Sequence, residues 1–201
     1  MPWTRLLAFI LPFTFVACSS YESKLADRST QYLGAGGSIV SQQSNTHLAD
    51  NISFWDGDGV QGAPSITISL SQQRAYFYKG GQLVGVSKIS TGREGYDTPP
   101  GNFKITQKSA NHRSNLYGDF VDANGNVVVS NVSAVRDKAP AGTKFLGASM
   151  PYFMRIHGAI GMHAGFLPGY AASHGCIRMP ERMAEIYFNN VSHGTPVSVI
   201  R

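Results

Sequence analysis

The chain has 201 residues, a formal net charge of +5, and charged side chains at only 14% of its positions. Its Lys and Arg residues form no run longer than two, which argues against a nucleic-acid-binding protein, because such proteins concentrate positive charge. The length suffices for one domain with a substantial apolar core. The mild positive charge suits an anionic surrounding such as a cell-wall polymer or a membrane surface, but it selects neither.

Residues 1–17 predict an export signal. Arg5 is followed by an uncharged apolar stretch that ends at Ala17, directly before Cys18. A membrane span needs about 20 apolar residues, so this stretch is too short to be one. The tetrad Phe15-Val16-Ala17-Cys18 resembles a bacterial lipobox, in which the cysteine is lipidated, although Leu is usual in place of Phe15.

Two outcomes are open for Cys18. If it is lipidated, we expect a periplasmic lipoprotein with an N-terminal lipid in the membrane. An Asp directly after the lipidated cysteine would mark retention in the inner membrane. Ser19 occupies that position here and therefore favours the outer membrane. Otherwise an ordinary signal peptide is cleaved, and the protein is exported all the same. In both cases Cys176 has no partner within the chain, so an intrachain disulfide is not expected. An unpaired cysteine in an oxidising compartment suggests a chemical role.

Residues 18–62 predict a polar, flexible linker, because they are rich in Ser, Gly, Gln, Asn and Asp and hold few apolar clusters. Phe54 and Trp55 are the exception, and they mark where the chain docks on the following domain. Residues 63–201 form that domain.

The domain has the sequence pattern of a β protein. Alternating polar and apolar residues predict strands at 65–70 and 102–106. Gly80-Gly81 predicts a tight hairpin between strands at 73–79 and 82–90. The other predicted strands span residues 117–121, 126–130, 152–157, 160–163 and 197–200.

One helix is predicted after Pro180, which suits the first helical turn. Met183, Ile186 and Tyr187 recur at helical spacing, and the helix is expected to end near Asn190. The expected fold is therefore mainly β with one short helix.

The segment Ser173-His174-Gly175-Cys176-Ile177-Arg178-Met179 predicts a nucleophilic cysteine. The thiolate is the reactive form, and nearby cationic groups lower the thiol pKa. Gly175 allows a tight turn in which the backbone N–H groups of His174, Gly175 and Cys176 point at a developing oxyanion. The alternative is a buried structural cysteine. The neighbours of Cys176 are mostly polar or charged, which favours the nucleophile.

This segment and four others together resemble the L,D-transpeptidase catalytic domain (YkuD-type) of bacterial cell-wall enzymes. The four others follow the family's order and are Gln73-Arg74-Ala75-Tyr76-Phe77-Tyr78, Ser90-Thr91-Gly92, Thr98-Pro99-Pro100-Gly101-Asn102-Phe103 and Gly194-Thr195-Pro196-Val197. The resemblance covers residues 63–201. It implies a β-sandwich in which the catalytic cysteine lies at the end of a strand and faces a groove.

The resemblance also implies a two-step acyl transfer on peptidoglycan. Cys176 is expected to attack the diaminopimelate carbonyl of a stem tetrapeptide, and the terminal D-alanine leaves. The acyl group then passes to an amine, giving a 3–3 cross-link or an attached protein, or to water, giving an L,D-carboxypeptidase product. The family needs no cofactor and no metal, and carbapenems are expected to inhibit the chain.

The family pairs its cysteine with an upstream histidine, and two histidines compete here. His157 lies in the usual Ile-His-Gly motif, whereas His163 precedes Ala-Gly as in one branch of the family. We expect His163 to be the base, with His157 as the alternative. His174 is expected to orient the loop or the acceptor, Arg178 to contact a substrate carboxylate or brace the loop, and Ser173 to support them.

The sequence also leaves other classes of protein open. His157, His163, His174 and Cys176 form a candidate zinc set, although their spacing matches no known ligand pattern. A catalytically inactive, peptidoglycan-binding lipoprotein that keeps the fold is a second alternative. A Cys/His endopeptidase of another fold is disfavoured, because papain-like enzymes place the nucleophile at a helix start near the mature N-terminus.

Overall fold

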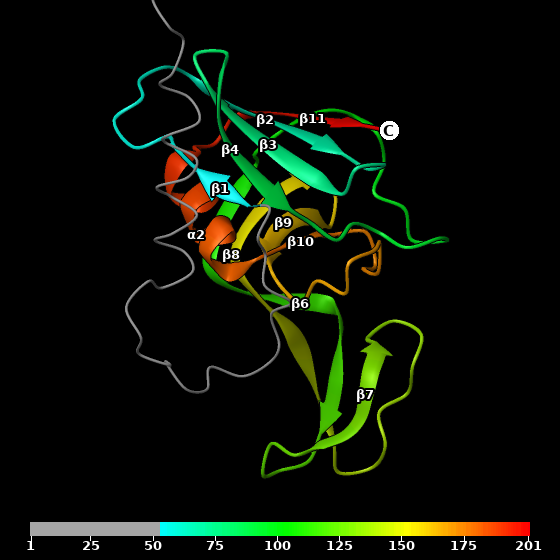
Figure 1. The fold of residues 1–201 in the computed structure, drawn as a ribbon. Helices are drawn as coiled ribbons and strands as arrows, with labels where there is room; N and C mark the ends of the chain where they lie inside the picture. Colours follow the sequence, from blue (N-terminus) through cyan, green and yellow to red (C-terminus); the bar gives the residue numbers. More distant parts are fainter. Residues whose placement is uncertain (1–52) are drawn as a thin grey trace, which may run out of the picture. The chain divides into compact units, whose positions relative to one another are not determined.

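The computed structural model describes residues 53–201 (Figure 1). The predicted export signal, Cys18 and most of the predicted linker lie outside the described residues. Within 53–201, no helix has the length and apolar character needed to cross a membrane.

Two β-sheets and one helix make up the described part of the chain. The first sheet has six strands in the order β1-β4-β3-β2-β11-β5. Its strands are β1 (Phe54–Trp55), β2 (Pro64–Ser69), β3 (Arg74–Lys79), β4 (Gln82–Lys88), β5 (Gly101–Lys104) and β11 (Pro196–Ile200). The second has five strands in the order β10-β9-β8-β6-β7. Its strands are β6 (Gln107–Val121), β7 (Val127–Ser133), β8 (Lys144–His157), β9 (Ile160–Ala164) and β10 (Ile177–Met179).

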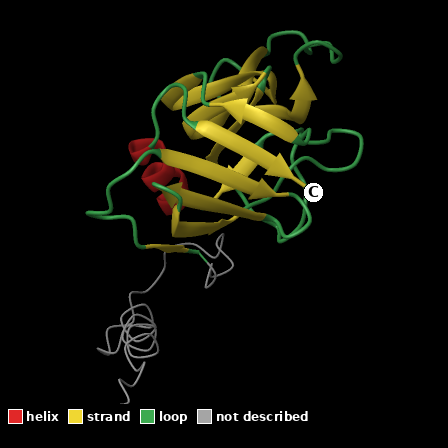
Figure 2. Cartoon of the chain, turned by 90° about the horizontal axis from the view of Figure 1, so that it is seen from above, coloured by secondary structure: helices red, strands yellow, loops and turns green. Residues whose placement is uncertain are grey.

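The helix α2 (Glu181–Asn190) follows β10 directly, and Figure 2 shows it in red beside the strands. The prediction of a mainly β fold with one short helix after the cysteine motif is confirmed. The helix packs against β8 and β9 of the second sheet. Tyr187 reaches the first sheet, where its ring lies 4.9 Å from that of Phe77 and its hydroxyl donates to the Ala75 carbonyl at 2.8 Å. This bond lets a fully buried tyrosine join the core without leaving a polar group unpaired.

The core lies between the two sheets and the helix. Alternation in β2 directs Ile66 and Ile68 into it, and both side chains are buried. Met154 of β8 and Met162 of β9 contribute from the second sheet. The hydrophobic pattern of the short strands thus accounts for most of the packing.

The sheets extend further than the sequence predicts in two places. Phe54 and Trp55, placed by the sequence in the linker segment, pair with β4 as strand β1, and the Trp55 ring packs edge-on against Phe77 at 5.2 Å. The first sheet therefore includes residues before position 63. Strands β6 and β8 have 15 and 14 residues, and together with β7 they continue away from the other strands (Figure 1).

The two sheets are joined next to the cysteine motif. β10 runs parallel to β9, with Arg178 opposite His163. On its other side, the backbone of Arg178 exchanges two hydrogen bonds with Ser90 of the segment after β4. The residue before β10, Cys176, is therefore held by both sheets.

Candidate active site

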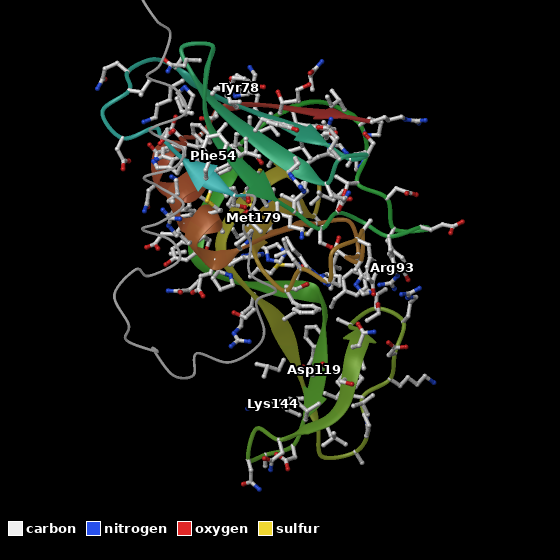
Figure 3. All side chains as sticks on the ribbon, viewed as in Figure 1. Phe54, Tyr78, Arg93, Asp119, Lys144 and Met179 are labelled. Carbon is white, nitrogen blue, oxygen red and sulfur yellow. The ribbon has the colours of Figure 1, made fainter. Side chains whose placement is uncertain are left out.

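A cavity of about 450 Å³ opens beside Cys176. His163 and His174 line it together with the cysteine, and Arg155 and Arg178 add two guanidinium groups. Among the described residues that line it, Asp119 of β6, labelled in Figure 3, is the one acidic residue. The lining therefore favours an anionic ligand.

Cys176 is partly buried, and its thiol lies 3.7 Å from the Ala159 carbonyl. Burial raises the pKa of the Cys176 thiol. A hydrogen bond from the Gly161 backbone and the charges of Arg155 and Arg178 oppose this effect without reversing it. The sequence predicted a lowered thiol pKa from the cationic neighbours, and that prediction is wrong in direction because desolvation outweighs them. The resting residue is a neutral thiol, which needs a base to become a nucleophile.

His163 on β9 is only 5% exposed, and its Nδ1 lies 2.8 Å from the Ala164 carbonyl. A carbonyl can only accept, so Nδ1 carries the proton and Nε2 has a free lone pair. Burial lowers the pKa of His163 to about 4, the Ala164 hydrogen bond opposes this, and the charge of Arg178 adds to it. At neutral pH the imidazole is therefore uncharged and able to accept a proton.

The competing histidine occupies a different position. His157 is exposed at the end of β8, its ring lies 5.1 Å from that of Phe103, and it does not line the cavity. Of the two candidates for the base, the structure therefore brings only His163 together with Cys176.

A third histidine, His112, lines the cavity and was not expected from the sequence. Its ring stacks on Phe153 at 4.2 Å. Burial and the charge of Arg155 lower the pKa of His112. It belongs to a polar stretch of β6 without any motif, so no signal in the sequence indicated it.

The loop before Cys176 is fixed by side chains rather than by regular pairing. Ser173 Oγ accepts from the Gly175 amide at 3.0 Å and donates to the Cys176 carbonyl. Gly175 has φ +110°, a backbone conformation that favours glycine. We expected the Gly175 amide to face a developing oxyanion, but it is committed to Ser173. The amides of His174 and Cys176 are left for that role.

Comparison with known proteins identifies the family. A family model for the L,D-transpeptidase catalytic domain matches residues 63–199. The chain belongs to the L,D-transpeptidase family. The probable L,D-transpeptidase YbiS of Escherichia coli (strain K12) is 27% identical over 175 residues, which cover 84% of this chain and 52% of that protein. The chain thus spans about half the length of the curated relatives it matches.

Solved L,D-transpeptidases share the fold. The protein from Stackebrandtia nassauensis has a TM-score of 0.51 at 19% identity, over 72% of this chain and 60% of that one. The protein from Xylanimonas cellulosilytica has a TM-score of 0.51 at 20% identity, over 69% and 61%. Ldtfm, solved as its avibactam carbamoyl enzyme, has a TM-score of 0.50 at 24% identity, over 69% and 49%.

Two of the segments that resemble the family support the loop before Cys176, called the cysteine loop below. The Gln73 side chain accepts from the Thr91 amide at 2.9 Å and donates to the Thr91 hydroxyl at 2.7 Å. The Thr91 carbonyl in turn accepts from the amides of Ala172 and Ser173. Gln73 therefore links the start of β3 to the cysteine loop. These positions lie far apart in the sequence, so local sequence patterns do not predict the contact.

Thr98 forms a second support. Its hydroxyl donates to the Gly175 carbonyl at 2.8 Å and accepts from the Gly92 amide at 2.9 Å. Thr98→Val removes both bonds and leaves the buried Gly175 carbonyl and the partly buried Gly92 amide unpaired, so we expect a loss of about 1–3 kcal/mol in unfolding free energy. We also expect about a tenfold change in the rate at which iodoacetamide alkylates Cys176, because the loop loses its fixed geometry.

Urea unfolding and alkylation kinetics measure these two effects. Thr106→Val is the matched control, since Thr106 is exposed and its hydroxyl contacts the Arg155 carbonyl only at 3.4 Å. If Thr98→Val and Thr106→Val behave alike in both assays, Thr98 does not support the loop.

The zinc alternative requires His157, His163, His174 and Cys176 to converge. Among residues 53–201, no three His, Cys, Asp or Glu side chains are grouped so that they share a metal ion. The exposed position of His157 removes one member of the proposed set. The geometry therefore argues against a zinc site made of these four residues.

Proposed function

We propose that this chain is a peptidoglycan L,D-transpeptidase with Cys176 as nucleophile and His163 as general base. One observation carries the proposal. Cys176 and His163 line the same cavity, and the Ala164 carbonyl fixes His163 in the tautomer whose Nε2 accepts a proton.

The first step forms a thioester. His163 Nε2 takes the thiol proton as Cys176 Sγ attacks the diaminopimelate carbonyl of a stem tetrapeptide. The amides of His174 and Cys176 stabilise the oxyanion of the tetrahedral intermediate. The carbon–nitrogen bond then breaks, and the D-alanine amine leaves with the proton from His163. Because the resting thiol is neutral, proton transfer has to accompany the attack.

The second step releases the acyl group. An amine of a neighbouring stem or of a protein, or a water molecule, gives a proton to His163 and attacks the thioester carbonyl. The carbon–sulfur bond breaks, and the sulfur regains the proton from His163. An amine yields a cross-link or an attached protein, and water yields a trimmed stem, which is the L,D-carboxypeptidase product.

The charge of the cavity supports an anionic stem peptide as substrate. Arg155 and Arg178 line it, and the planar guanidinium of Arg178 matches a carboxylate in geometry. We propose that Arg178 binds a stem carboxylate near the scissile bond. β-Lactams that acylate a cysteine, carbapenems among them, are expected to react with Cys176. The avibactam carbamoyl enzyme of Ldtfm shows a related reaction in a protein of this fold.

Mass spectrometry of muropeptides tests the proposal. Tetrapeptide-rich peptidoglycan is incubated with the chain, and Cys176→Ala serves as the control. We expect 3–3 cross-linked dimers, tripeptide stems or both, with release of D-alanine. Binding to peptidoglycan without any change in its muropeptides would instead favour the inactive wall-binding alternative.

We also propose that the chain is exported and anchored through a lipid on Cys18, on the periplasmic face of the outer membrane. Acyl chains contribute about 0.8 kcal/mol per buried CH₂, so several chains together anchor a protein firmly. Cys18→Ser is expected to move the protein from the detergent phase to the aqueous phase and leave its activity intact. Detergent partitioning and mass analysis of the mature N-terminus measure this. A wild-type protein with an unmodified N-terminus would contradict it.

A further inference from the structure

His174 and Arg93 form a contact that the proposed mechanism does not use. Arg93 Nη2 lies 2.9 Å from His174 Nε2. A guanidinium only donates hydrogen bonds, so Nε2 of His174 has to be the acceptor and carries no proton. The imidazole is then neutral, with its single N–H at Nδ1.

The His174 ring is also fixed in orientation. Tyr117 of β6 stacks on it at 4.2 Å with an interplanar angle of 19°, and Tyr96 meets it edge-on at 4.8 Å. The Arg93 guanidinium lies over the Tyr96 ring at 4.5 Å, and Arg136 donates to the Tyr96 hydroxyl at 2.8 Å. Two tyrosines and Arg93 therefore determine the plane in which the imidazole lies.

The surrounding charges also favour the neutral form of the His174 imidazole. Burial lowers the pKa of His174, and the charges of Arg93, Arg178 and Arg136 lower it further. These groups come from three elements: Arg93 from the segment after β4, Arg178 from β10, and Arg136 from the segment after β7 (Arg93 is labelled in Figure 3). Among residues 53–201, no carboxylate contacts the ring to favour its protonated form.

The remaining ring nitrogen is free to bind a ligand. Within residues 53–201, His174 Nδ1 has no hydrogen-bond partner, and every fully buried side-chain nitrogen or oxygen there has one. Nδ1 is therefore not sealed inside the protein, and His174 lines the cavity beside Cys176.

We infer that Arg93 holds His174 as the neutral Nδ1–H tautomer, and that this N–H donates a hydrogen bond to an oxygen of the substrate next to the scissile bond. Arg93 is then a positioning residue, which acts on the reaction only through His174. The substrate contact rests on the proposed function, whereas the tautomer does not.

The tautomer is tested by nuclear magnetic resonance on the chain labelled with ¹⁵N-histidine. Two-bond ¹H–¹⁵N correlation spectra from pH 5 to pH 8 report which ring nitrogen is protonated, and His174→Gln identifies the His174 signals. We expect an unprotonated Nε2 in the wild type. In Arg93→Met we expect tautomer exchange and a His174 pKa raised above that of the wild type, because one of the charges that lower it is gone while burial, Arg178 and Arg136 remain. Arg136→Met removes a charge beside the same tyrosine but no hydrogen bond to His174, so the His174 tautomer should stay as in the wild type.

Kinetics test the substrate contact. We expect Arg93→Met to lower kcat/KM for a tetrapeptide substrate about tenfold at pH 7 and to add a further loss at acid pH, where His174 is protonated more readily than in the wild type. Arg93→Lys should restore part of the activity, because an ammonium group also only donates. Arg136→Met should stay within about twofold of the wild type.

The outcomes separate the two claims. An Nε2–H tautomer in the wild type, or an unchanged tautomer in Arg93→Met, overturns the assignment. A changed tautomer with unchanged kcat/KM keeps the assignment and overturns the substrate contact. If the wild type itself has no activity on stem peptides, the proposed function fails together with the substrate contact, and the spectra still decide the tautomer.

Discussion

Cys176→Ala is expected to lower turnover of stem tetrapeptides by at least about 10³-fold and to abolish acylation by carbapenems. In the proposed mechanism the sulfur forms the thioester, and no other cysteine exists in residues 53–201 to replace it. The fold should survive, because the thiol is only partly buried and makes one long contact with the Ala159 carbonyl. We expect the unfolding free energy to stay within about 1 kcal/mol of the wild type.

Muropeptide analysis and the mass of the carbapenem-treated protein measure the two losses, and denaturant unfolding checks the fold. Cys176→Ser is a closer mimic in shape, and it should be nearly as inactive. A well-folded Cys176→Ala protein with near-normal turnover would exclude Cys176 as the nucleophile.

The short strands of the fold were predictable because each has one buried face. β2 alternates cleanly, so the period of its apolar residues alone predicts a strand. The first ten residues of β6 were missed because this part of the strand is mostly polar, with only Ser114 buried. It pairs with β8 through backbone hydrogen bonds, which any sequence is able to form. β10 was missed because three residues are too few to show a period.

The candidate site was likewise predictable only where its residues are close together in the sequence. The cysteine motif is local in sequence, so Cys176, His174 and Arg178 were found together. The direction of the Cys176 thiol pKa shift was predicted wrongly, because a thiol pKa depends on desolvation by residues from other strands. Arg93 lies 81 positions before His174, and only the folded chain brings the two side chains into contact.

The choice between His157 and His163 illustrates the limit of motif reasoning. The more familiar motif surrounds His157, yet the turn after β8 leaves that residue exposed. His163 lies on β9 beside β10, so the parallel pairing of these two strands brings it next to the cysteine segment. Strand pairing, rather than the local motif, decides which histidine lines the cavity.

His163→Ala is expected to lower the rate of Cys176 acylation by about 10² or more, because the neutral thiol then loses the histidine whose Nε2 is free to accept its proton. His157→Ala is the matched control and should cost less than about threefold, since His157 is exposed and outside the cavity. Acylation by a carbapenem, followed by mass spectrometry over time, measures both. The reverse ranking would assign the base to His157.

The pH dependence gives an independent check on His163. Its pKa is about 4, so the wild type should keep its kcat/KM as the pH falls through 6.5 and lose it only near pH 4.

The folded-state pKa of His163 lies below the unfolded value of about 6.5, so the unfolded chain binds more protons between these limits. The fold should therefore lose about 2–3 kcal/mol of stability from this group as the pH falls from 7 to 4.5. Denaturant unfolding of the wild type and His163→Ala at both pH values isolates that contribution, which the variant should lack. An acid limb of kcat/KM near pH 6.5, or equal acid destabilisation of the two proteins, would show that His163 is not the buried neutral base.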